Sequence, residues 1–316
     1  MRRAGGALMA IFAAGAFAAC DGQEAGIGLR EPVRVRGGQF IAGPLPGTEP
    51  GATGRGGPAV TSVTSQSRIV LPGQAGKAFD GRVANTATSV AVRFQDLGEG
   101  YWVFLLSGPD ALFPGELSWH ADLDFNAEFA DRPGFHPLRF VGIDANGSAG
   151  EQVEADICLA STLPDNLHSC DASKAPPDVV VSLEWDADVD LDLRVVTPDG
   201  VSVDPKHPAT ARDDAGAPAA SSGQIDRDSN VACASDARRR ENLVWQQRPS
   251  GVFDVYASLF DSCGKPAVRY VLTVYEAEGV MPDRALVAKR TIKGIATAIE
   301  ASGGASTGQY LTSYSF

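Results

Sequence analysis

The stretch of sequence that decides the fold is Glu184-Trp185-Asp186-Ala187-Asp188-Val189-Asp190-Leu191-Asp192-Leu193-Arg194-Val195-Val196. Most of its odd positions are apolar, and its even positions from 186 to 192 are all aspartate. A repeat of two is typical of a strand with one dry and one wet face, so the whole stretch is predicted to be a strand. Pro198-Asp199-Gly200 then turns the chain, because proline presets the first turn dihedral and glycine accepts a positive φ. Val201 and Val203 begin the predicted return strand.

The acidic face of this strand needs an explanation. Neighbouring carboxylates on such a face lie roughly 6 to 7 Å apart, which is twice the rise per residue, and their repulsion is a cost unless a positive charge lies opposite. In one interpretation the face is solvated and is answered by arginines from other strands. The candidate arginines are Arg194, Arg227, Arg238, Arg239 and Arg240. In the other interpretation, several carboxylates hold a hard cation such as Ca²⁺.

A second run, Asp226-Arg227-Asp228-Ser229-Asn230, spaces oxygen-bearing side chains two residues apart and is able to complete a cation site. It is not an EF-hand loop, because the glycine at the sixth position and the glutamate at the twelfth are both missing. The candidate metal ligands from the two runs are Asp186, Asp188, Asp190, Asp192, Asp226, Asp228 and Asn230.

The beginning of the chain has the layout of a secretory signal peptide over residues 1–19, with a basic start and a small, apolar run from residue 4 to residue 19. That run is too short and too rich in alanine and glycine for a membrane span. Phe17-Ala18-Ala19-Cys20 resembles the lipobox of bacterial lipoproteins, which implies that Cys20 is lipidated. The alternative is ordinary cleavage with Cys20 free or paired. The resemblance implies an extracytoplasmic protein that is anchored to the cell envelope, at the outer membrane or the cell surface. In such lipoproteins an aspartate directly after the cysteine, here Asp21, can signal retention at the inner membrane, so that location is an alternative.

Net charge limits the choice of partners. Removal of residues 1–19 takes away two arginines and lowers the formal net charge from −12 to −14. A chain this acidic has no electrostatic attraction to phosphate backbones or anionic lipid surfaces. We therefore expect no nucleic acid partner, membrane contact through the lipid anchor only, and an unidentified protein or glycan ligand.

Cysteine usage agrees with export. Without Cys20, four of the five cysteines are left, an even number that suits an oxidising compartment. Three pairings are possible, and local spacing favours disulfides from Cys158 to Cys170 and from Cys233 to Cys263. The alternative is four free thiols.

The remaining pattern predicts an all-β chain with two β-sandwich domains. Residues 20–60 are dense in glycine and proline and are predicted to be a flexible tether. Residues 61–160 contain short apolar runs separated by turn residues, which indicate a first sandwich with Trp102 and Trp119 in its core. Residues 161–178 form a linker, and residues 179–316 form the second sandwich, which is predicted to include a hairpin of residues 252–260 and 268–276 and to end in a last strand before Phe316.

Two resemblances refine this organisation. Residues 132–147, with a Pro-Gly turn, an alternating strand and an Asp-x-x-Gly turn, resemble the late strands of immunoglobulin-like domains of bacterial envelope proteins. Residues 179–276 resemble the YfaP-like domain of bacterial envelope proteins, which implies a jelly-roll or similar sandwich without a settled activity. The segments that carry the second resemblance are Trp185-Asp186, Val189 to Leu193, Pro198-Asp199-Gly200, Asp226-Arg227-Asp228, Glu241 to Trp245 and Pro249 to Tyr256. It implies that Asp190, Asp192, Asp228, Glu241 and Asn242 are the residues to test, and it adds Glu241 to the candidate metal ligands.

No reaction can be read from the motifs. The four histidines are scattered, and neither His-x-x-x-His nor Cys-x-x-Cys occurs. Ser262-Cys263-Gly264-Lys265 matches a Ser-x-x-Lys motif by letters alone, since that motif needs companion segments. We expect a protein that is not an enzyme, with a binding or scaffolding role, that is stabilised by calcium and uses no other cofactor.

Two further functions stay open. A carbohydrate-binding or adhesion module predicts an exposed row of aromatic side chains that includes Trp185 and Trp245. A hydrolase predicts a cleft with two carboxylates in opposed environments.

Overall fold

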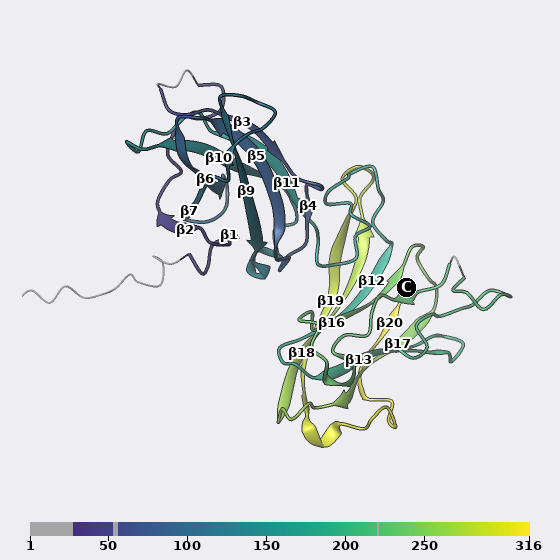
Figure 1. The fold of residues 1–316 in the computed structure, drawn as a ribbon. Coiled ribbons are helices and arrows are strands. Elements are labelled where there is room, and N and C mark those ends of the chain that lie inside the picture. The colour runs from purple at the N-terminus through teal and green to yellow at the C-terminus, as the bar shows by residue number, and fades with distance from the viewer. Residues whose placement is uncertain (1–27, 53–55, 220) are drawn as a thin grey trace, which may run out of the picture.

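The computed structural model describes residues 28–52, 56–219 and 221–316. Within these ranges the chain consists of β-strands, turns and short 3₁₀ turns, and the all-β sandwich fold is confirmed (Figure 1). None of the helices in the described ranges has the length and apolar character needed to cross a membrane. The signal peptide predicted for residues 1–19 and the lipidation predicted at Cys20 lie outside the described residues.

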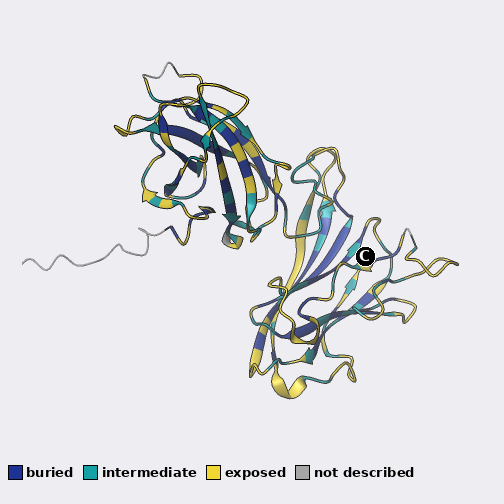
Figure 2. Cartoon of the chain, viewed as in Figure 1, coloured by how far each residue is buried: buried dark blue, intermediate teal, exposed yellow. Residues whose placement is uncertain are grey.

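Two sheets enclose the first hydrophobic core, which is formed by residues between 33 and 159. The five-stranded sheet has the order β1-β9-β5-β3, with β8 also paired to β9. Its strands are β1 (Val33–Val35), β9 (Glu116–Phe125), β5 (Lys77–Ala84), β3 (Val60–Thr64) and β8 (Gly108–Pro109). The six-stranded sheet has the order β2 (Gln39–Ala42), β7 (Gly100–Leu105), β6 (Ala87–Phe94), β10 (Gly134–Asp144), β11 (Val153–Leu159) and β4 (Ile69–Val70). Trp102 and Trp119 are both buried in this core, as predicted, and Trp119 stacks on Phe140. Figure 2 shows buried and exposed residues alternating along the strands of the sheets.

Part of the predicted tether belongs to this sandwich. Residues 20–60 include β1, which pairs with β9, and β2, which pairs with β7. The interpretation of the whole segment as a flexible tether was therefore wrong for these residues. The reason is the short alternation Val33-Arg34-Val35, which buries both valines against the core in spite of the glycines and prolines that surround it.

Two further sheets enclose the second core, which is formed by residues between 179 and 296. One sheet has the order β15 (Gln224–Ile225), β16 (Arg240–Trp245), β12 (Val179–Trp185), β18 (Ala267–Glu278) and β19 (Ala285–Thr297). The other has the order β14 (Ser202–Val203), β13 (Asp190–Val196), β17 (Val252–Asp261) and β20 (Gln309–Ser315). The last strand, β20, pairs with β17 at the sheet edge, in agreement with the predicted final strand.

The stretch from Glu184 to Val196 is two strands and not one. Strand β12 ends at Trp185 in one sheet, and β13 begins at Asp190 in the facing sheet. The alternation survives the crossing because Trp185 and Leu191 both point into the core that the two sheets share. A repeat of two therefore cannot show that a chain has changed sheets.

The same limit affects a second prediction. Residues 252–260 and 268–276 do not form a hairpin, because β17 pairs with β13 and β20 whereas β18 pairs with β12 and β19. The turn at Pro198-Asp199-Gly200 is confirmed as a hairpin: Gly200 has a φ of 85°, and Val195 lies opposite Val203 in β14.

The predicted pairing of the four later cysteines is confirmed, with disulfides from Cys158 to Cys170 and from Cys233 to Cys263. The first disulfide joins the end of β11 to the connection between the sandwiches. In that connection no strand occurs between β11 and β12. The second disulfide joins two loops of the second sandwich and lies next to the acidic residues described below.

Candidate functional site

Three carboxylates meet where β13 begins. Asp190 and Asp192 are two residues apart on β13, and Asp228 lies in the loop between β15 and β16. Each of the three offers a carboxylate oxygen, and these oxygens all lie within 4.8 Å of one another. We call these three residues the aspartate cluster. They approach one another because Leu191 and Leu193 face the core, which leaves the aspartates on the other face of β13.

A fourth carboxylate, Glu241 on β16, lies beneath the aspartate cluster and is completely buried. It accepts hydrogen bonds from the backbone N–H of Leu193 at 2.7 Å and from the backbone N–H of Ser229 at 3.1 Å. Glu241 therefore holds together both sheets and the loop that carries Asp228.

Burial of these groups shifts their pKa values upward. The pKa of Asp190 is raised to about 6, mainly by burial and with a contribution from the charge of Asp228, although the backbone N–H of Ala232 opposes the shift through a 2.8 Å hydrogen bond. The pKa of Asp192 is raised to about 7 by burial and then by Asp190 and Asp228. Burial also raises the pKa of Asp228, and it raises the pKa of Glu241 well above its usual value. Glu241 and Asp190 are therefore buried and Asp192 is partly buried, whereas Asp228 is exposed, and none of the four carboxylates forms an ion pair within the described residues.

The cluster has few partners of its own. Neither Asp192 nor Asp228 accepts a hydrogen bond or forms an ion pair through its side chain within the described part of the chain. The nearest cationic influence is Lys206, whose charge lowers the pKa values of all three aspartates. Lys206 forms no ion pair with them; its ammonium lies 4.6 Å from the centre of the Phe260 ring.

A small cavity of about 30 Å³ adjoins the cluster on the side of Asp192. Its lining residues are Asp192, Arg194, Asp204, Pro205, Lys206, Ser258 and Gly304. A space of this size holds one or two water molecules, since a single water needs about 10 to 15 Å³. It can supply water ligands to an ion but cannot admit a sugar or peptide substrate.

The other predicted metal ligands lie apart from the cluster. Asp188 pairs with Arg239 at 2.8 Å, and the carboxylate of Asp186 accepts a hydrogen bond from the backbone N–H of Arg269. The structure thus brings together three of the eight predicted ligands, with Glu241 next to them. Asp186 and Asp188 instead contact arginines, as the first interpretation of the acidic face expects.

Two more predicted ligands are occupied by structural hydrogen bonds. Asp226 accepts hydrogen bonds from the backbone and the side-chain amide of Asn242 at 2.9 and 2.8 Å. The Asn230 side chain donates to the carbonyl of Val189 and accepts from the backbone N–H of Asp236. Both residues therefore shape the loop that delivers Asp228.

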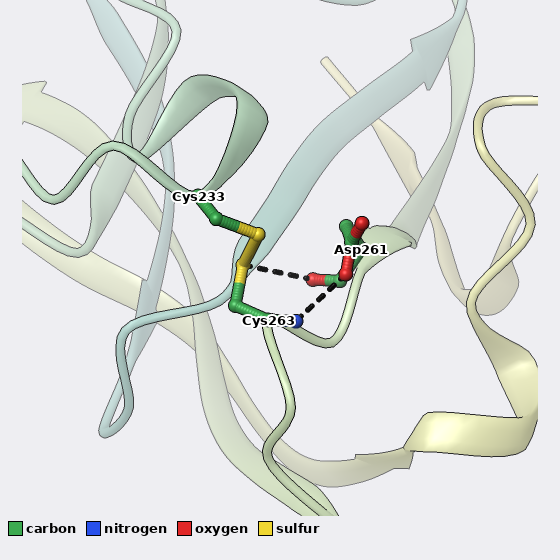
Figure 3. Close-up of side chains that lie close together, drawn as sticks. All are labelled: Cys233, Asp261 and Cys263. Carbon is green, nitrogen blue, oxygen red and sulfur yellow. Dashed lines mark hydrogen bonds between the residues drawn. A yellow bond between two sulfur atoms is a disulfide. The ribbon is translucent and has the colours of Figure 1, made fainter.

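Cys233, Asp261 and Cys263 form a second group of potential metal-binding side chains (Figure 3). The two sulfurs are joined in a disulfide, so neither is available as a thiolate ligand. Asp261 accepts a hydrogen bond from the backbone N–H of Cys263 at 2.7 Å. This group fixes the loop at Cys233 and is not a metal site.

Sequence reasoning missed Lys206, Asp204 and Asp261. Asp204 and Lys206 directly follow the return strand β14, so the hairpin register places them beside β13. That signal was present in the sequence. Asp261 pairs opposite Asp190, and this placement depends on β17 lying in the same sheet as β13, which the sequence did not show.

The donor set of the cluster suits a hard cation. All three aspartates offer oxygen, and Ca²⁺ takes six to eight oxygen ligands, including water. The features predicted by the two alternative functions, a carbohydrate-binding or adhesion module and a hydrolase, are not found at the residues named for them. Trp185 and Trp245 are only 6 and 1 % exposed and form no aromatic platform. Burial raises the pKa values of all the clustered carboxylates, so the opposed environments expected for a hydrolase are not found among them.

Comparison with known proteins adds little to this picture. No family model matches the chain, and no curated protein matches it. Among solved structures, the chain is similar to the C-terminal domain of the Streptococcus agalactiae AgI/II polypeptide BspA, with 10% identity and a TM-score of 0.20 over 71% of this chain and 94% of that chain. A structure titled BspA_C_mut has 10% identity and a TM-score of 0.22 over 76% of this chain and 98% of that chain. Similarity this low carries no argument about function, and the immunoglobulin-like and YfaP-like resemblances stay predictions.

Proposed function

We propose that this protein is a lipid-anchored binding or scaffolding component of the bacterial cell envelope, and that a Ca²⁺ ion held by Asp190, Asp192 and Asp228 stabilises its second, YfaP-like sandwich. The observation that carries the calcium proposal is the approach of three carboxylate oxygens within 4.8 Å, without a cationic partner at ion-pair distance in the described residues. Mutual repulsion at this distance is costly in a partly buried site. A divalent cation removes that cost and converts the cluster into a stabilising contact.

The location in the envelope rests on other features. Two disulfides suit an oxidising compartment, since cytosolic thiols are normally kept reduced. The lipobox-like segment before Cys20 supports anchoring through a lipid. The cavity of about 30 Å³ beside the aspartate cluster has no room for a sugar or peptide substrate, which supports an ion-binding and not a catalytic role for this cluster.

The ion acts by linkage in this proposal. An ion that binds the folded chain but not the unfolded chain stabilises the fold by about 2.7 kcal/mol when its concentration is one hundred times its dissociation constant. Asp190 and Asp192 belong to β13, whereas Asp228 belongs to the loop after β15. A shared ion therefore fastens the loop to the sheet.

Thermal unfolding tests the calcium proposal. The melting temperature of the mature protein is measured in EDTA and in millimolar Ca²⁺, and we expect it to rise by several degrees in Ca²⁺. The Asp192→Asn variant should lose this rise. The control is Asp186→Asn, because Asp186 is exposed and contacts Arg269 instead of the cluster. A wild-type melting temperature that does not respond to Ca²⁺ would remove the proposal.

A further inference from the structure

A second, larger cavity of about 820 Å³ lies between the two sandwiches and is separate from the aspartate cluster. It is lined by the connection between β4 and β5, by the 3₁₀ turn after β9, by residues 161–164 and by the outer face of β16 with the loop before it. Its volume lies within the range of small-molecule sites, about 300 to 1,000 Å³, and sites of that kind are frequent between domains.

The connection that forms one wall of this cavity is fastened at both ends. Cys170 is joined by its disulfide to Cys158 at the end of β11, in the first sandwich. The side-chain amide of Asn166 donates a 2.8 Å hydrogen bond to Gln246, which follows β16 in the second sandwich. Residues 161–164 lie between Cys158 in β11 and Asn166, so this segment is held on both sides and the cavity is a built feature of the fold.

The two principal walls differ in chemistry. The wall from the first sandwich and the connection is largely apolar and includes Leu71, Pro72, Ala127, Ala130, Leu163 and Pro164. The wall from the second sandwich is charged and includes Arg227, Arg238, Arg240, Glu184, Asp226 and Asp236. A ligand that fits both walls must be polar on one side and apolar on the other.

The carboxylates of the charged wall already have hydrogen-bond or ion-pair partners within the protein. The Asp226 carboxylate accepts two hydrogen bonds from Asn242. Asp236 accepts hydrogen bonds from the hydroxyl of Ser229 and from the backbone N–H of Arg238, both at 2.9 Å. Glu184 forms an ion pair with Arg240. These carboxylates are poor partners for an incoming cation.

The arginines of this wall, in contrast, have guanidinium N–H groups without an acceptor among the described residues. The Arg238 guanidinium forms no hydrogen bond or ion pair with any described residue, and Arg227 contacts only its neighbour Asp226, at 3.3 Å. The Nε of Arg240 is buried without a partner, as is the Oδ1 of Asn242. Burial of an unsatisfied polar atom costs roughly 1 to 3 kcal/mol. The arginines of the charged wall therefore lack acceptors, whereas the Oδ1 of Asn242 lacks a donor. Carboxylates are the groups that guanidinium donors match best.

We propose that the cavity between the sandwiches binds a small organic carboxylate with an apolar flank. The carboxylate accepts hydrogen bonds from Arg238 and Arg227, and the apolar flank lies against Leu71 and its neighbours. This site does not depend on calcium, and the test is performed in EDTA so that its result is independent of the aspartate cluster.

Binding of 8-anilinonaphthalene-1-sulfonate by the folded protein provides the test, because this dye combines an anion with an apolar ring system. We expect saturable binding with one dye per chain. 1-Naphthoate should displace the dye, whereas the neutral 1-naphthalenemethanol should bind about tenfold more weakly or less, since it cannot pair with the guanidinium groups.

Variants on the two walls establish the location. Arg238→Ser and Leu71→Asp should each weaken dye binding by about tenfold or more. Arg269→Ser and Leu105→Asp are the matched controls, because both residues are exposed and lie outside the cavity, and neither substitution should change the affinity. All four side chains lie at least partly in solvent, so the variants are expected to fold.

Three results would overturn the inference: absence of saturable binding, equal affinity for the neutral and the anionic naphthalene, or insensitivity to either Arg238→Ser or Leu71→Asp. Insensitivity to Leu71→Asp would overturn it because the first sandwich would then contribute no wall to the site.

Discussion

The Glu241 side chain accepts a 2.7 Å hydrogen bond from the backbone N–H of Leu193, and this bond links β16 of one sheet to β13 of the facing sheet. A carboxylate that is wholly buried between two sheets normally has a cationic partner, whereas Glu241 has two backbone N–H groups and lies beside the aspartate cluster. The second sandwich therefore buries the Glu241 carboxylate next to its core without a cationic partner among the described residues.

Glu241→Ala should destabilise the protein by about 2 to 4 kcal/mol, because it leaves the buried N–H groups of Leu193 and Ser229 without an acceptor. Urea unfolding at constant pH measures the change. Glu278→Ala is the control, since Glu278 is exposed and pairs with Lys289 on the surface, and its loss should cost less than about 1 kcal/mol. Equal effects of the two substitutions would contradict the role given to Glu241.

The metal-free protein should become less stable as the pH rises from 5 to 8. In the folded state the pKa values of Asp190 and Asp192 are about 6 and about 7, both above the value of about 3.9 for an aspartate in the unfolded chain. The folded state therefore binds protons more tightly, and the stabilisation present below the unfolded-state pKa is lost as the pH rises through 6 and 7.

Melting temperatures in EDTA across this pH range measure the effect. The Asp192→Asn variant should have a flatter profile, because the group that titrates near pH 7 is absent. Saturating Ca²⁺ should flatten the wild-type profile as well. A wild-type melting temperature that rises steadily towards pH 8 in EDTA would contradict the charge balance described here.

The Cys233–Cys263 disulfide should support the cation site. It fixes the loop that carries Asp228 and the Ala232 N–H, and this loop contains non-glycine residues with left-handed backbone, Asn230, Ala232 and Cys233, at φ values of 62°, 50° and 64°. Such conformations persist only where the surrounding structure holds them.

Replacement of both cysteines by serine should lower the free energy of unfolding by about 3 kcal/mol and should weaken Ca²⁺ binding by about tenfold or more. The matched control is the Cys158→Ser and Cys170→Ser double variant, which removes a disulfide far from the cluster and should leave Ca²⁺ affinity unchanged. If the two double variants bind Ca²⁺ equally well, the loop does not depend on its disulfide.

Cys20 should carry the lipid. Cells that express the full chain and are fed labelled palmitate are expected to yield labelled protein in the membrane fraction, whereas Cys20→Ser should abolish the label and release the protein. The Cys158→Ser and Cys170→Ser double variant should keep the label, which excludes these two cysteines as the site of lipidation. Unlabelled wild-type protein in the cytosol with reduced thiols would contradict the proposed location.

Much of the second sandwich was predictable from short-range pattern. The alternation from Leu191 to Val195 and the turn at Gly200 together predict β13, β14 and the hairpin between them, because side-chain period and turn chemistry are local properties. The pairing of strands between sheets was not predictable in this way. Residues 186–189 and 262–266 each carry the chain from one sheet to the other, and an apolar residue that faces a shared core looks the same from either sheet.

The sequence predicted that aspartates from this region form the site, but it did not predict which of the candidate residues come together. Asp190 and Asp192 share a strand face, so their approach followed from the sequence, whereas Asp186 and Asp188 precede the strand and turn towards Arg269 and Arg239. The central position of Glu241 depends on β16 lying across from β13, a contact between residues far apart in the chain.

A crystal structure grown with calcium tests the central claim most directly. We expect a single anomalous peak within about 2.3 to 2.6 Å of carboxylate oxygens from Asp190, Asp192 and Asp228. Calcium-grown crystals with no peak at this position, and with the Lys206 ammonium paired to the three aspartates instead, would contradict the account.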